Sequence, residues 1–160
     1  MDADKKAALA GENFRSGYNC AQSVLLAFCE ETGLKKEAAA RFASSFGGGM
    51  GRMREVCGAV SGMFMVAGLL TGYDDPKDRA AKAALYERVR NLAGQFTEKN
   101  GSIICRKLLE GVPATGGGAP GERTETYYRK RPCTCYVEDA ARLVAEALGA
   151  QSGNGGQNDA

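Results

Sequence analysis

The chain has no histidine among its 160 residues, so the commonest side chain for acid–base catalysis and metal binding is missing. Without imidazole there is no Ser-His or Cys-His catalytic pair, no Cys2His2 zinc site and no Cys-x-x-Cys-His haem attachment. Thiolate sulfur is then the strongest soft metal ligand that remains and the only easily reversible redox group. We therefore expect the chemistry among the six cysteines, which are Cys20, Cys29, Cys57, Cys105, Cys133 and Cys135.

Strong charge imbalance and long apolar runs are also missing. The net charge of +2 gives no reason to expect binding to nucleic acid or to an anionic membrane. The longest apolar stretch, residues 63–70, is too short to span a bilayer, and the acidic start lacks a signal-peptide pattern. We expect a cytoplasmic protein, where thiols are normally reduced and a cysteine set more often serves metal or redox chemistry than structural disulfides.

Strand signals are scarce, whereas helical periodicity recurs along the chain. With 44% apolar residues, a chain of this length can bury a core without disulfides. We predict an all-α, single-domain helical bundle of about six to seven helices over residues 1–150, followed by a disordered tail at 151–160. The expected helices are 4–15, 19–33, 36–46, 55–70, 74–99, 103–109 and one that follows the last cysteines to 149, with loops at 47–51 and 111–121.

Four of the cysteines fall at or near the expected start of a helix: Cys20, Cys57, Cys105 and Cys133. Such an end presents free N–H groups and the positive end of the helix dipole, which favour thiolate over thiol. Convergence of these four helix ends would produce an electropositive site for anionic sulfur.

The other two cysteines fit such a site less well. Cys29 follows Cys20 by nine residues, about 180° around a straight helix, so we interpret it as a small buried apolar group. Cys135 lies two residues after Cys133 and would share its face only in an extended segment. We keep Cys135 as a reserve ligand or resolving thiol.

The segment 57–62, Cys-Gly-Ala-Val-Ser-Gly, has almost no side-chain bulk at Gly58 and Gly62. Their four-residue spacing suits close packing of two helices, and it equally leaves room for a bulky inorganic group. The glycine run at 47–51 lacks the Lys-Ser/Thr and the preceding strand of a phosphate-binding loop. We interpret it as a sharp turn beside Cys57.

Together these segments resemble the C_GCAxxG_C_C family of redox-active proteins over about residues 14–148. The likeness is carried by Cys20 within Tyr-Asn-Cys-Ala-Gln-Ser-Val-Leu, by the 57–62 motif, by Cys105, and by Cys133 ahead of Tyr-Val-Glu-Asp-Ala-Ala. The chain reads C-G-A-x-x-G, so its first Gly and Cys are transposed relative to the family's label. The resemblance implies an all-helical fold and four functional cysteines.

The resemblance also bears on the cofactor. A related domain of split-Soret cytochromes is thought to hold an iron–sulfur cluster beside its haems, and the missing histidines remove the haem part here. A cluster site then remains, carried by Cys20, Cys57, Cys105 and Cys133 with Gly58 and Gly62 beside them.

Four thiolates can serve three chemistries. Structural zinc usually uses close Cys-x2–4-Cys pairs, and a dithiol enzyme usually carries Cys-x-x-Cys, neither of which occurs here. Widely separated ligands suit a preformed helical site for an iron–sulfur cluster, [2Fe–2S] or [4Fe–4S], in electron transfer or redox sensing. A metal-free thiol–disulfide oxidoreductase and a zinc-stabilised interaction domain remain as alternatives, and enzymatic activity is left open.

Basic residues directly precede two of the candidate ligands. They are solvated loop charge or, alternatively, stabilise an anionic centre and steer an acidic redox partner protein. Tyrosines nearby either line the same mouth or pack against the bundle, and a homodimer is left open. The basic residues are Arg52, Arg54, Arg129, Lys130 and Arg131, and the tyrosines are Tyr127, Tyr128 and Tyr136.

Overall fold

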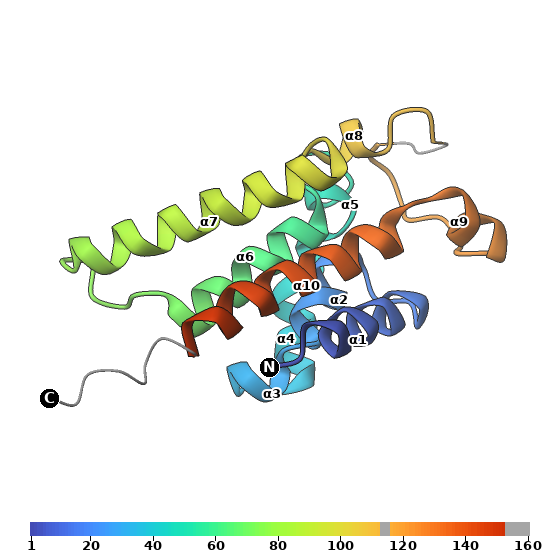
Figure 1. Ribbon diagram of the computed structural model, residues 1–160. Coiled ribbons are helices and arrows are strands. Elements are labelled where there is room, and N and C mark those ends of the chain that lie inside the picture. Colours follow the sequence, from blue (N-terminus) through green and yellow to red (C-terminus); the bar gives the residue numbers. More distant parts are fainter. Residues whose placement is uncertain (113–115, 153–160) are drawn as a thin grey trace, which may run out of the picture.

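Helices make up the regular structure, as predicted (Figure 1). The computed structural model describes residues 1–112 and 116–152, and within these ranges the extended pairing is one isolated bridge between Val56 and Ile104. The helices are α1 (Ala3–Arg15), α2 (Cys20–Leu26), α3 (Cys29–Thr32), α4 (Lys36–Ala43), the 3-10 turn η1 (Ser44–Phe46), α5 (Gly47–Met50), α6 (Gly58–Thr71), α7 (Arg79–Asn100), α8 (Cys105–Leu108), α9 (Glu125–Lys130) and α10 (Cys133–Ser152). Short helices raise their number above the six to seven expected.

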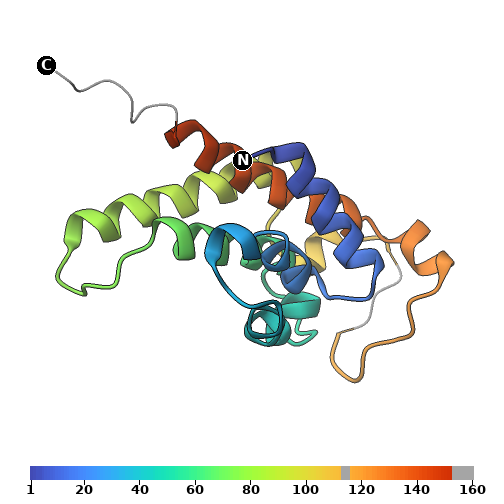
Figure 2. The same ribbon diagram turned by 90° about the horizontal axis from the view of Figure 1, so that it is seen from below.

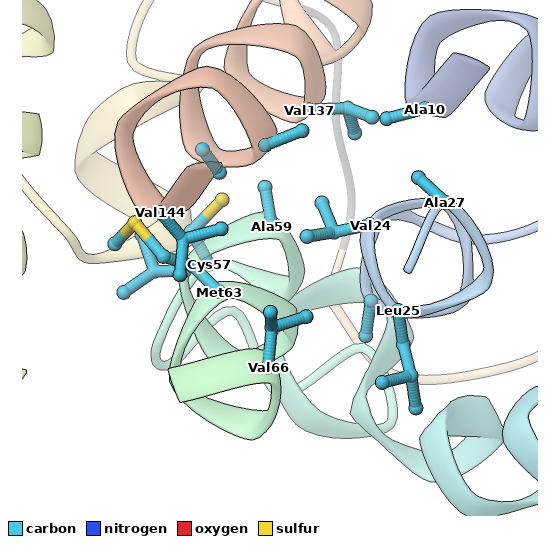
Figure 3. Close-up of a cluster of buried hydrophobic side chains, with 14 of the residues drawn as sticks. Ala10, Val24, Leu25, Ala27, Cys57, Ala59, Met63, Val66, Val137 and Val144 are labelled. Carbon is cyan, nitrogen blue, oxygen red and sulfur yellow. The ribbon is translucent and has the colours of Figure 1, made fainter. Parts of the chain in front are cut away.

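Two helices, α6 and α10, form the centre of the bundle. Helix α10 packs against α1, α6 and α7, while α2 fills the space between α1, α4 and α6 (Figures 1 and 2). Figure 3 shows Ala59 of α6 near Val137 of α10 and Val24 of α2, and all three side chains are fully buried. The near-uniform apolarity of α6 therefore reflects contacts on most of its sides.

Close contact between α2 and α6 depends on two glycines. A Cβ atom on Gly62 would lie 2.9 Å from the carbonyl oxygen of Ala21 and 2.9 Å from Cβ of Val24. A Cβ atom on Gly58 would lie 3.0 Å from Cβ of Cys20. The spacing therefore serves helix packing, and it brings the start of α6 against the start of α2.

Three predicted boundaries were wrong. The helix expected over 19–33 breaks after Leu26, where the Ala27 carbonyl accepts a hydrogen bond of 3.0 Å from Lys6 Nζ. Helix α6 begins at Gly58 rather than 55, because residues before it are extended and pair with the 103–105 segment. Helix α7 begins at Arg79, capped by Asp78, rather than at 74.

Other differences concern the second half of the chain. Among the apolar residues of α7, Leu92 and Phe96 are buried, whereas Leu85 and Val89 remain half-exposed. Helix α9 was not predicted. Helix α10 continues to Ser152, past the expected end at 149, and the rest of the predicted tail, 153–160, lies outside the described residues.

None of the helices in the described ranges has the length and apolarity needed to cross a membrane.

The glycine contact predicts opposite effects for two alanine substitutions in α6. Gly62→Ala should lower the free energy of unfolding by about 1–3 kcal/mol, because its Cβ overlaps α2. Gly68→Ala is the matched control, since its Cβ would meet nothing within 4 Å, and it should raise that free energy by up to about 1 kcal/mol. Urea unfolding measures both; equal effects of the two substitutions would contradict the packing role.

Candidate functional site

The four cysteines at helix starts line one cavity of about 50 Å³. Cys20, Cys105 and Cys133 are the first residues of α2, α8 and α10, and Cys57 is the N-cap of α6. Cys57, Cys105 and Cys133 are buried, and Cys20 is half-buried. Separate parts of the chain therefore bring four thiols to one place.

A capping box fixes Cys20. The Asn19 side chain accepts from the Gln22 N–H at 2.9 Å, and the Gln22 side chain accepts from the Asn19 N–H at 3.0 Å. Asn19 also donates to the Ser44 carbonyl at 3.0 Å and lies against Gly47, where a Cβ would come within 2.7 Å of it. The start of α2 is thereby anchored to the glycine turn.

The isolated bridge between Val56 and Ile104 fixes two further thiols. Cys57 N–H donates to the Ile103 carbonyl at 2.8 Å, and Cys105 N–H donates to the Glu55 carbonyl at 2.6 Å. Because side chains alternate along extended chain, both cysteines lie on the face opposite Val56 and Ile104. The sequence signal that could have indicated this bridge is the β-branched residue directly before each of the two cysteines.

The glycine turn forms another wall of the cavity. Gly48 and Gly49 adopt the left-handed region, with φ of 68° and 66°, and Met50, at 65°, continues it. A Cβ on Gly49 would lie 2.6 Å from Cβ of Cys105, so only glycine fits there. The turn expected beside Cys57 is therefore built against Cys105.

Of the other predicted site residues, one lines the cavity and the rest lie outside it. Gly58 lines the cavity, whereas Gly62 is one turn further along α6 and contacts α2. Cys135 is exposed on α10 and does not share the face of Cys133. Cys29 packs at the edge of the core but is only half-buried, less enclosed than we predicted.

Cys20 and Cys133 form an asymmetric thiol pair. The Cys20 thiol hydrogen-bonds the Cys133 sulfur, which raises the pKa of Cys20, as does burial, and lowers the pKa of Cys133. Positive charge on Arg131, Arg54 and Arg123 lowers the pKa of Cys133 further. Cys133 is thus the thiol of the four that the protein favours as thiolate.

The two thiols beside the bridge are held protonated in the metal-free chain. Burial raises the pKa of Cys57 to about 12, although the N–H groups of Val60 and Ala59 act against this rise. Burial also raises the pKa of Cys105, against which Arg54 acts by donating from Nη1 to the sulfur at 3.7 Å. Both side chains are therefore neutral thiols near neutral pH.

Three arginines surround these sulfurs: Arg54, Arg123 and Arg131 all line the cavity. The sequence indicated Arg54 and Arg131 by their position before cysteines. It gave no such signal for Arg123, which reaches the site from the segment before α9. Arg129 is exposed and pairs with Glu125 at 3.8 Å.

The tyrosines divide between the site and the core. Tyr127 and Tyr136 line the cavity, and burial raises the pKa of both phenols. Tyr136 also donates to the Leu108 carbonyl at 3.1 Å, which ties α10 to α8. Tyr128 instead packs edge-on against Phe14, with ring centroids 5.8 Å apart.

Tight convergence on a single ion is not found. Among residues 1–112 and 116–152, no three or more Cys, Asp or Glu side chains are arranged to hold one metal ion. Four cysteines that ligate one ion would place their sulfurs at about 2.3 Å from a shared point. The four thiols share a cavity, but no three of them are grouped to hold one ion.

The thiol pair predicts a defined order of alkylation. In a reduced, metal-free Cys135→Ala background, where Cys133 is the only cysteine that follows Cys105 in the sequence, Cys133 should react with iodoacetamide at lower pH than an ordinary thiol. Cys20→Ala removes the hydrogen-bond donor and should shift this profile to higher pH, whereas Cys29→Ala should not. Peptide mass spectrometry across pH reads the rates; a Cys133 profile insensitive to Cys20→Ala would exclude the pair.

Comparison with known proteins agrees with this geometry. A family model described as "Putative redox-active protein (C_GCAxxG_C_C)" matches residues 18–147, a range that contains all four cavity cysteines. No curated protein and no solved structure matches the chain. Because the matched range covers most of the 160 residues, the chain belongs to the C_GCAxxG_C_C family of redox-active proteins.

Proposed function

We propose that the protein binds an iron–sulfur cluster through Cys20, Cys57, Cys105 and Cys133 and uses it for electron transfer or redox sensing. The observation that supports this proposal is the shared cavity, to which four helix starts each contribute one thiol. Four cysteines are the usual ligand set of both [2Fe–2S] and [4Fe–4S] clusters.

The electrostatics of the cavity suit an anionic centre. A cluster held by four thiolates carries net negative charge, and three guanidinium groups line the wall. The same lining contains neither Asp nor Glu among the described residues, so no carboxylate opposes that charge. Helix starts at α6 and α10 add the positive ends of two long helices.

The grouping of the thiols favours a cluster over a single ion. One zinc ion needs all its sulfurs within about 2.3 Å of one point, whereas a cluster distributes its ligands over several metal atoms. Among the described residues, no three of these side chains are grouped to hold one ion. The small cavity, about 50 Å³, would enclose a compact inorganic group, [2Fe–2S] or [4Fe–4S].

The residues of the chain would have distinct tasks around such a centre. The bound cluster supplies reversible one-electron transfer. Cys57 and Cys105 lie on a rigid bridge and Cys20 on a capped helix start, so three of the ligands are positioned before binding. Gly49 and Gly58 keep the wall open, while Arg54 and Arg131 balance the charge of the thiolates.

A second candidate is supported by the contact between Cys20 and Cys133. A metal-free dithiol can lose two protons and two electrons to an acceptor disulfide and form a Cys20–Cys133 bond. The lowered pKa of Cys133 favours it as the attacking thiolate, and Cys20 would then resolve the mixed disulfide. This chemistry uses two of the four cavity thiols and leaves Cys57 and Cys105 without a task.

Anaerobic purification of single cysteine variants separates the two candidates. Cys57→Ser and Cys105→Ser should lose iron, acid-labile sulfide and the visible absorption of the wild type, because each removes one ligand. Cys29→Ser and Cys135→Ser are the controls and should keep all three, since neither residue lines the cavity. Colourless, iron-free wild type with a titratable disulfide couple, unaffected by Cys57→Ser, would favour the dithiol candidate instead.

A further inference from the structure

The three arginines of the cavity each have defined contacts within the chain. Arg123 donates to the carbonyl oxygens of Phe14 at 3.0 Å and Tyr18 at 2.8 Å, and its guanidinium lies 4.4 Å from the Phe14 ring centre. These contacts leave its positive charge uncompensated at short range while fixing its direction. A guanidinium of this kind does not reorganise when an anion arrives.

The other two guanidinium groups are also fixed. Arg131 lies 4.6 Å from the centre of the Tyr127 ring and donates to the Tyr127 hydroxyl at 3.5 Å. Arg54 extends from the glycine turn and donates to the Cys105 sulfur. The glycine turn, the segment before α9 and the segment before α10 thus each place one cation on the same cavity.

Shape and charge together indicate a ligand class. The cavity is small, about 50 Å³, and its lining combines three arginines with four thiols, which suits a compact anion such as a tetrahedral oxyanion. A guanidinium group can bind two oxygens of such an oxyanion through paired, charge-assisted hydrogen bonds. No Asp or Glu among the described lining residues would repel it.

We propose that, in the reduced and metal-free protein, this cavity is a binding site for a small inorganic oxyanion, held by Arg54, Arg123 and Arg131 beside the thiols. The site does not depend on the cluster, because the arginines are oriented by carbonyl, ring and thiol groups of the chain itself. An oxyanion and a cluster would use the same space, so each excludes the other.

Sulfate is the probe for this site. The full chain, reduced and freed of metal with a chelator, is titrated with millimolar sulfate by calorimetry at ionic strength held constant with sodium chloride. One sulfate should bind per chain. Arg123→Gln and Arg131→Gln should each weaken binding about tenfold or more, because each removes charge-assisted hydrogen bonds. Arg129→Gln is the matched control and should bind as the wild type does, since Arg129 is exposed and outside the lining.

Three results would overturn the proposal. One is the absence of sulfate binding beyond the ionic-strength effect, and another is equal affinity in the Arg123, Arg131 and Arg129 variants. A metal-free chain without helical circular dichroism would also overturn it, because the site would not exist without metal. Iron content is not read in this experiment, so its outcome is separate from that of the cluster proposal.

Discussion

The site depends first on how closely α2 and α6 approach each other. Gly58 and Gly62 let the two helices meet with backbone near backbone, and this contact places Cys20 next to the start of α6, where Cys57 lies. A Cβ atom at Gly62 would lie 2.9 Å from the carbonyl oxygen of Ala21, so any side chain there would push the two helices apart. The small residues therefore serve helix packing, and this packing in turn sets the distance between Cys20 and Cys57, which lie 37 positions apart in the sequence.

The second requirement is a balance of charge without carboxylates. Burial keeps Cys57 protonated in the metal-free chain, with a pKa of about 12, while Cys133 is favoured as thiolate by a neighbouring thiol and by arginines. This difference limits repulsion among the four sulfurs, because a neutral thiol does not repel a neighbouring thiolate. If the proposed cluster binds, the remaining thiols would have to lose their protons.

The sequence predicted the helical class and the four cysteines because both follow from local rules: apolar periodicity, and the capping potential of residues such as Asn19. It did not reveal the bridge at Val56 and Ile104 or the break after Leu26, since both depend on partners distant in the chain. Arg123 was missed for the same reason, because its place in the cavity is set by carbonyls of Phe14 and Tyr18. No cysteine lies close to Arg123 in the sequence to indicate its place in the cavity.

Native mass spectrometry of the anaerobically purified protein tests the central claim most directly, because one spectrum distinguishes all the chemistries that four thiols allow. The account predicts a chain that carries iron and inorganic sulfide in equal numbers and loses them together on oxidation in the presence of a chelator. A bare chain lighter by two hydrogen atoms, or a chain with a single zinc ion, would contradict it.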